Sequence, residues 1–302
     1  MVDTVSGRPP VILIGMHRSG TSLMTRVLAR MGLFVGAERD PNEEALFFLR
    51  INRWLVRQAG GAWDRPAPVL DLLAHRDVRR LAHEHVERLM RSPKAASYLG
   101  LHQYLRHRGI RRIDAPWGWK DPRNTFTLPL WLDLFPDARV IHVCRHGVDV
   151  ARSLLVRHQK VVDHAKRMRG RARPFDWVRF EQGPFADTVR CSTLEGGFDL
   201  WDEYVRQASD SVRALGDQAM EVRFEEFVAD PRPWLVRMSD FCGLDARNGM
   251  IDEARAIVRQ GRSFGYRRDP VLQAFAQRMG PRLSVVGYTE PEVSVPPPRA
   301  SA

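Results

Sequence analysis

Short apolar runs alternate along the chain with longer stretches in which apolar residues recur at helical spacing. Residues 11–14 form such a run and predict a buried strand. A turn that contains Gly15 and Gly20 follows. The next apolar residues recur at helical spacing until Gly32, which predicts the helix end. We therefore expect a strand–loop–helix unit over residues 10–32.

The remaining pattern predicts further strands and helices in alternation. Expected strands cover 117–120, 139–145 and 220–224, and expected helices cover 71–92, 95–108, 125–135, a segment that starts near 148, 200–215 and 234–241. Because strands that alternate with helices form parallel sheets, the expected fold is α/β of the P-loop type. Helices should cover both faces of the sheet in three α/β/α layers. We expect a single domain with helical and loop insertions.

Composition separates a main domain from less regular parts. Residues 1–9 form a short polar leader, the domain covers 10–289, and the Pro-rich residues 290–302 are expected to be a disordered tail. Within the domain, residues 157–197 are basic and predict an irregular insertion. This segment could lie over the active site, or it could be an exposed structural loop.

The charge balance is strongly basic, with 47 Lys and Arg against 36 Asp and Glu, a formal net charge of +11 and a pI near 10.3. A basic surface suits a polyanionic ligand, a nucleic acid or an anionic membrane, or it consists of arginines that are merely solvated. Three cysteines without C-x-x-C spacing argue against a disulfide scaffold or a zinc site and favour a reducing compartment. Without a signal-peptide pattern or an apolar run of about 20 residues, we expect a cytoplasmic protein with no membrane span.

The loop after the first expected strand has the features of a phosphate site. Gly15 and Gly20 have the Walker A separation, but Thr21 stands where that motif requires Lys, and the positive charge lies within the loop as Arg18. Because the first N–H groups of a helix have no partner within the helix, a loop of this kind binds anions. It lacks the Lys that reaches the outer phosphates of ATP.

A second segment fits the same anionic ligand. The expected strand at 139–145 ends in Arg145, and Ser153 follows on the next helix. A cation at the end of a buried strand needs a partner. A phosphate would pair with the guanidinium through two hydrogen bonds, whereas Asp149 could pair with it in a purely structural salt bridge.

The pairing of Arg-Ser-Gly-Thr-Ser at 18–22 with Arg145 and Ser153 resembles the sulfotransferases that use 3′-phosphoadenosine 5′-phosphosulfate (PAPS). Within them it is similar to a bacterial branch that resembles tyrosylprotein and carbohydrate sulfotransferases. The match is supported by Trp-Lys-Asp-Pro-Arg at 119–123, Leu-Trp-Asp-Glu-Tyr at 200–204 and Val-Arg-Phe-Glu-Glu-Phe at 222–227. Each motif is weak alone, but their order and spacing are specific, and together they cover most of the chain.

The resemblance implies the donor and the residues that bind it. PAPS would be the sulfuryl donor and adenosine 3′,5′-bisphosphate (PAP) the product, with no metal ion. Arg145 and Ser153 would bind the 3′-phosphate, and Phe224 stands where related enzymes often place a Tyr against the adenine. The 5′-phosphosulfate would be held by the loop residues Arg18, Ser19, Gly20, Thr21 and Ser22.

The resemblance also implies a general base on the second helix. No His follows Lys120, as it does in the steroid and phenol enzymes, so we expect a Glu. The pattern predicts a helix with Asp40 as N-cap and Glu43 in the capping-box position, running as far as Gly60. That assignment explains Glu43 and leaves Glu44 as the candidate base, or as a helix N-terminal acid favoured by the dipole.

Lys120 and Arg18 complete the expected catalytic group. Both cations would stabilise charge on the transferring group and on the departing phosphate. Asp121 could orient Lys120, or it could pair with Arg123 in a purely structural turn. His17 could be a hydrogen-bonding loop residue or a participant in the chemistry.

The expected function is transfer of a sulfuryl group from PAPS to a hydroxyl of a small molecule or glycan, with a sugar, a lipid, a metabolite and a tyrosine all open as acceptors. A P-loop kinase or other phosphoryl transferase is the nearest alternative, but it would need the missing Walker Lys and a Mg²⁺-binding acid. The alternative function of nucleic-acid binding is supported by charge alone, because the sequence has no helix-turn-helix, zinc or RNA-recognition signature. The sequence does not determine the oligomeric state.

Overall fold

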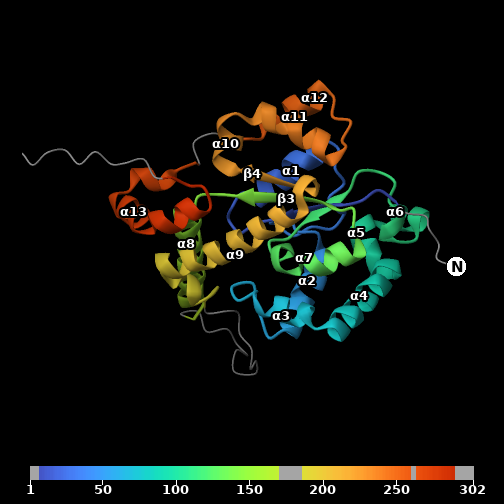
Figure 1. Cartoon of the computed structure of the whole chain (residues 1–302), viewed down its shortest axis with the longest axis horizontal. Helices are drawn as coiled ribbons and strands as arrows, with labels where there is room; N and C mark the ends of the chain where they lie inside the picture. Colours follow the sequence, from blue (N-terminus) through green and yellow to red (C-terminus); the bar gives the residue numbers. More distant parts are fainter. Residues whose placement is uncertain (1–6, 170–185, 260–262, 290–302) are drawn as a thin grey trace, which may run out of the picture.

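A parallel four-stranded sheet forms the centre of the protein (Figure 1). The computed structural model describes residues 7–169, 186–259 and 263–289. In the order β2-β1-β3-β4, its strands are β1 (Val11–Ile14), β2 (Gly118–Lys120), β3 (Arg139–Cys144) and β4 (Ala219–Arg223). Every strand pair is parallel. The predicted strands are therefore confirmed.

The strand register brings the two predicted anion motifs to one edge of the sheet. Ile14 of β1 pairs with His142 of β3, and Leu13 pairs with Lys120 of β2. Because parallel strands all end at the same edge, the loop after β1, the end of β2 and Arg145 after β3 are neighbours. The sheet thus positions residues that lie more than 100 positions apart in the sequence.

Helices surround this sheet. The α-helices are α1 (Thr21–Arg30), α2 (Leu46–Gln58), α3 (Pro68–Ala74), α4 (Arg76–Arg91), α5 (Ala96–Leu99), α6 (Leu101–His107), α7 (Asn124–Leu134), α8 (Gly147–Arg169), α9 (Leu194–Leu215), α10 (Phe224–Ala229), α11 (Pro231–Cys242), α12 (Asn248–Ala256) and α13 (Pro270–Val285). None of the helices in the described ranges is long and apolar enough to cross a membrane.

The two faces of the sheet belong to two apolar clusters, as alternation along the strands requires. Val11 and Leu13 face a cluster built with α1, α10, α11 and α12, whereas Ile12 and Ile14 face a larger cluster that includes residues of α2, α7 and α9. Figure 1 shows these two sets of helices on opposite sides of the strands. The three-layer α/β/α fold is confirmed.

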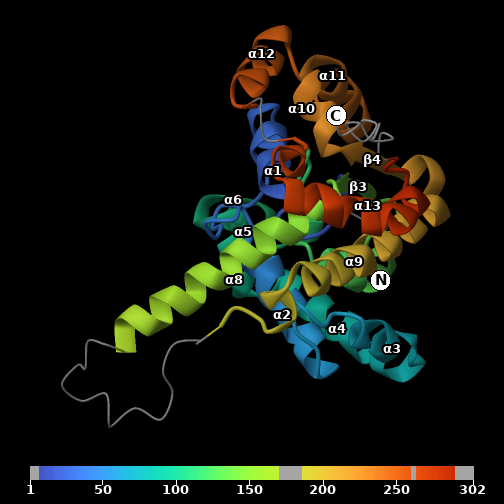
Figure 2. The ribbon, with the colours of Figure 1, turned by 90° about the vertical axis from the view of Figure 1, so that its left-hand side faces the viewer.

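Residues 157–197 differ from the sequence expectation at both ends. Helix α8 continues without a break to Arg169, and α9 already begins at Leu194. No Gly or Pro interrupts the sequence between Gly147 and Gly170, so nothing ends the helix earlier. Figure 2 shows the C-terminal half of α8 extending away from the rest of the domain. Residues 170–185 lie outside the described residues.

Two other expected helices are each split. The stretch 71–92 is divided at His75, whose extended backbone separates α3 from α4. The stretch 95–108 is divided at Gly100, which has φ 75° and separates α5 from α6. The expected tail 290–302 and residues 1–6 of the leader lie outside the described residues.

Candidate active site

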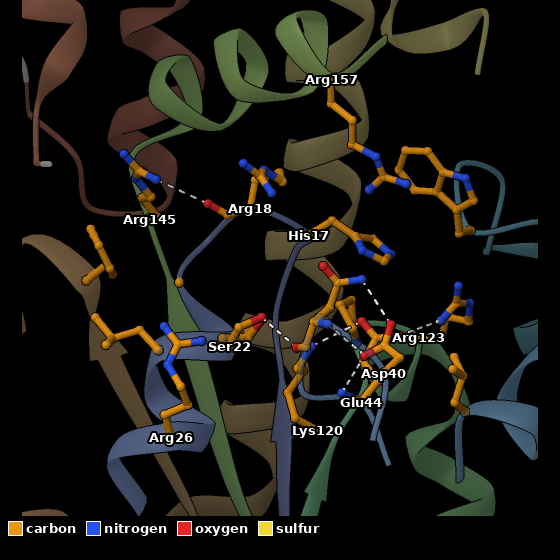
Figure 3. Close-up of a pocket in the computed structure, with 18 of the residues that line it drawn as sticks. His17, Arg18, Ser22, Arg26, Asp40, Glu44, Lys120, Arg123, Arg145 and Arg157 are labelled. Carbon is orange, nitrogen blue, oxygen red and sulfur yellow. Dashed lines mark hydrogen bonds and ion pairs between the residues drawn. The ribbon is translucent and has the colours of Figure 1, made fainter. Parts of the chain in front are cut away.

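A cavity of about 770 Å³ opens at the edge of the sheet where β1, β2 and β3 end (Figure 3). Most of the residues proposed from the sequence meet there. Those in its wall are Arg18, Gly20, Thr21, Ser22, Glu44, Lys120, Arg145 and Phe224. Ser19 and Ser153 lie behind the wall. The cavity therefore gathers residues from three strand ends, α1, α10 and the segment before α2.

The loop after β1 depends on glycine at two positions. Gly15 has φ 133°, and a Cβ there would lie 2.5 Å from the carbonyl oxygen of Val143. Gly20 has φ 94°, and a Cβ there would lie 2.3 Å from the ring of Phe224. Both the backbone angle and the close approach exclude a side chain. The loop consequently lies tight against β3 and α10.

The start of α1 presents donors to the cavity. Among the described residues, the backbone N–H groups of Thr21, Ser22 and Leu23 have no acceptor, and all three residues line the cavity. The Ser19 N–H instead donates to the carbonyl of Met16 at 3.2 Å. The Ser19 side chain is fully buried, and its hydroxyl has no partner in the part of the chain that is described. Within the described residues, the N–H groups of Thr21, Ser22 and Leu23 therefore remain available at the cavity, whereas that of Ser19 is already bonded.

Arg18, Arg145 and Ser153 are joined directly. The Arg18 Nε donates to the Ser153 hydroxyl at 2.8 Å, and Arg145 Nη1 donates to the Arg18 carbonyl at 3.3 Å. Arg18 reaches this position from a backbone with φ 70°. The structure thus brings the loop motif and the later Arg–Ser motif together. Ser153 contacts the cavity through Arg18 rather than by lining it.

The structural salt bridge between Arg145 and Asp149, which was the alternative to a phosphate contact, is also present. Arg145 pairs with Asp149 at 3.3 Å, and the same carboxylate accepts hydrogen bonds from the backbone N–H groups of Gly265 and Tyr266. Asp149 therefore attaches the segment before α13 to the start of α8. Arg145 still lines the cavity, so the salt bridge holds its guanidinium beside the site.

Phe224 lies beneath the loop. Its side chain is only 5% exposed, and the Arg145 guanidinium carbon is 4.8 Å from the ring centroid. Gly20 covers part of the ring edge. The ring thus contacts both anion motifs.

The expected helix start at Asp40 is wrong. Helix α2 begins at Leu46, and residues 40–44 form a tight loop in which the Asp40 carboxylate accepts from the N–H groups of Asn42 and Glu44. Glu43 has φ 65° and pairs with Arg39 at 2.6 Å, so it does not cap a helix. An Asp can bind the backbone of a loop as readily as that of a helix end. The sequence pattern alone did not separate these two cases.

Glu44 is buried in the cavity wall between two cations. The Lys120 Nζ lies 3.1 Å from one of its oxygens and Arg123 Nη1 lies 3.5 Å from the other. Burial, together with the nearby Asp121 carboxylate, raises the pKa of Glu44 even though both cations oppose this shift. A carboxylate with a raised pKa accepts a proton more readily near neutral pH.

Of the two roles considered for Asp121 from the sequence, the structure shows the pairing with Arg123. The Asp121 carboxylate accepts from the backbone N–H and from the guanidinium of Arg123, both at 2.9 Å. This pair fixes the turn and also directs Arg123 toward Glu44. Asp121 makes no contact with the Lys120 ammonium that would orient it directly.

Asn52, which was not proposed from the sequence, holds these elements in place. Its amide donates to Asp121 and Asn124 at 3.0 and 2.7 Å, and its carbonyl accepts from Thr127 and Trp131 at 2.8 and 2.9 Å. The residue is fully buried and every polar atom of its side chain is satisfied. A lone Asn on the apolar face of α2 was the signal that could have identified it.

The wall beyond Glu44 also contains residues that the motifs did not identify. Trp63 lies between His17, whose ring centroid is 4.9 Å away, and Arg157, whose guanidinium carbon is 4.9 Å from the ring. Burial and the positive charges of Arg123 and its neighbours lower the pKa of His17 well below its usual value. His17 is therefore neutral at neutral pH.

A cleft at the carboxyl edge of a parallel sheet, with free helix N–H groups and converging arginines, defines an anion-binding α/β protein. The model of the sulfotransferase family matches residues 9–248. The chain therefore belongs to the sulfotransferase family. No curated protein matches the sequence.

Three of the solved structures to which the chain is similar are the following. Sulfotransferase STF1 from Mycobacterium tuberculosis H37Rv is 15% identical with a TM-score of 0.48, covering 92% of this chain and 78% of that chain. The sulfotransferase domain of the Synechococcus PCC 7002 olefin synthase is 20% identical with a TM-score of 0.44, covering 96% and 92%. A sulfotransferase from Alicyclobacillus acidocaldarius is 17% identical with a TM-score of 0.45, covering 94% and 98%.

Proposed function

We propose that the protein transfers the sulfuryl group of PAPS to a hydroxyl of a small-molecule or glycan acceptor, with Glu44 as the general base. The observation that carries this proposal is the meeting in one cavity of two anion motifs with a buried Glu–Lys pair. A binding protein would need the anion motifs alone. A carboxylate beside a cation supplies both proton transfer and charge stabilisation.

The residues at the loop fit a phosphate-bearing donor. The N–H groups of Thr21, Ser22 and Leu23 face the cavity without an acceptor among the described residues. Arg145 and Arg18 lie at the adjacent end of the same cavity. In this proposal the helix N-terminus holds the 5′-phosphosulfate, and Arg145 holds the 3′-phosphate together with Ser153, whose hydroxyl is bonded to the neighbouring Arg18.

The chemistry then requires little beyond positioning. PAPS supplies a sulfuryl group that is already activated by its phosphate. Glu44 accepts the proton of the acceptor hydroxyl as its oxygen bonds to sulfur, and the sulfur–oxygen bond to the phosphate breaks. Lys120 and Arg18 stabilise the negative charge that develops on the oxygen atoms. The raised pKa of Glu44 suits this role.

A comparison of donors tests this proposal. The purified protein is incubated with a panel of hydroxylated sugars, phenols and lipids and with either [³⁵S]PAPS or [γ-³²P]ATP. We expect label from PAPS alone, and we expect Glu44→Gln to abolish most of the transfer. Transfer from ATP and none from PAPS would favour the phosphoryl-transferase alternative instead.

A further inference from the structure

The acceptor side of the cavity carries cations that the donor motifs do not use. Figure 3 shows Arg123 on the side of Glu44 away from Arg145, and Arg157 above His17 in the same cavity. Leu49 and Arg53 line the cavity as well. These two residues are four positions apart on α2 and therefore lie on the same face of that helix. Besides Arg18 and Arg145, the cavity wall thus contains Arg53, Arg123 and Arg157, of which Arg123 contacts Glu44.

The carboxylates that accompany these cations lie behind the wall. Asp121 pairs with Arg123, and Asp187 pairs with Arg157 at 2.8 Å, yet neither acid lines the cavity. The Arg53 side chain has no hydrogen bond or ion pair with any residue in 7–169, 186–259 or 263–289. The ligand would therefore meet charged N–H donors, with Glu44 and Asp40 as carboxylates of the same wall.

The wall is also held in one geometry. The Arg157 guanidinium lies against Trp63, and the Trp63 carbonyl accepts the Tyr204 hydroxyl at 2.7 Å. Arg190 donates to the next carbonyl, that of Asp64, at 2.8 Å. A guanidinium fixed in this way loses little freedom when it binds an oxyanion.

We propose that the acceptor is itself an anion, a hydroxyl compound with a phosphate or carboxylate group that Arg53 and Arg157 bind beside Trp63. This inference rests on the proposed sulfuryl transfer, because it assumes that Glu44 faces the acceptor hydroxyl. Charge-assisted bonds from a planar guanidinium recognise the oxyanion, and a neutral analogue would leave these donors unpaired.

Phenyl phosphate is a suitable probe, because it combines an oxyanion with a flat ring. It is titrated calorimetrically into protein saturated with PAP, so that the donor's phosphate sites are already filled. We expect phenyl phosphate to bind and phenol not to bind. Arg53→Gln should weaken the affinity for phenyl phosphate about ten- to hundredfold. Arg50→Gln, an exposed residue of α2 outside the cavity wall, should change it less than about twofold.

The outcomes separate the two proposals. Failure of PAP itself to bind would overturn the proposed function. Normal binding of PAP without binding of phenyl phosphate would overturn only the anionic acceptor. Equal affinity of the Arg53→Gln and wild-type proteins for phenyl phosphate would overturn the site assigned to the anion.

Discussion

The Lys120 ammonium lies 3.1 Å from the Glu44 carboxylate, and both side chains are almost fully buried. Charges in such a place are costly unless they are paired. The pair joins the end of β2 to the loop before α2, and Arg123 reaches the second oxygen of the carboxylate. Its position between the phosphate loop and the acceptor side makes it the centre of the proposed chemistry.

Replacing Glu44 by Gln should lower kcat by roughly 10²–10⁴-fold, because the acceptor hydroxyl would lose its proton acceptor. The affinity for PAP, measured by calorimetry, should stay nearly unchanged. Glu43→Gln is the matched control, since Glu43 pairs with Arg39 and Arg26 and does not itself line the cavity. A large loss of kcat in His17→Gln with little loss in Glu44→Gln would move the base to His17.

The pH dependence of kcat should report the environment of Glu44. The base acts only when it is deprotonated, so kcat should fall as the pH drops through the pKa of Glu44. This fall, the acid limb of the pH profile, should lie above pH 4.5 because burial raises the pKa. Lys120→Met removes a cation that opposes this rise. The acid limb should therefore move to still higher pH, whereas a shift to lower pH would contradict the assignment.

The loop glycine that faces Phe224 should tolerate no side chain. Gly20→Ala should lower the free energy of unfolding by about 1–2 kcal/mol or more, because of its positive φ and the 2.3 Å approach to Phe224. PAP binding should weaken as well. Gly249→Ala in α12 has open space around the new Cβ and should instead stabilise the protein by about 0.4–1 kcal/mol. Urea unfolding of both variants tests this contrast.

Transfer should need no divalent cation. Arg18 and Lys120 would supply the positive charge that Mg²⁺ supplies in a kinase. Activity with PAPS should therefore persist in excess EDTA. Loss of activity that is complete and restored by Mg²⁺ would support a phosphoryl transferase.

The strands and the anion motifs could be predicted from the sequence because each has a local signal. Apolar runs such as 11–14 predict buried strands, and the sheet register then brings Arg18 and Arg145 together. The order and spacing of these motifs along the chain then gave the resemblance to the sulfotransferase family. The fold and eight of the residues that line the cavity therefore follow from short stretches of sequence.

The remaining errors arise where one local pattern has two structural solutions. Asp40 followed by Glu43 fits a helix N-terminus, but here the Asp40 carboxylate binds loop N–H groups instead. The contributions of Asn52, Trp63 and Arg157 depend on contacts between distant elements. No spacing in the sequence could reveal those contacts.

The affinity for PAP compared with that for AMP tests the central claim most directly. The two nucleotides differ by the 3′-phosphate, which Arg145 is proposed to bind. PAP should raise the melting temperature by mass action, and AMP should bind markedly more weakly. Arg145→Ala should weaken PAP about ten- to hundredfold through loss of a charge-assisted contact. Equal binding of PAP and AMP to the wild-type protein would contradict the account.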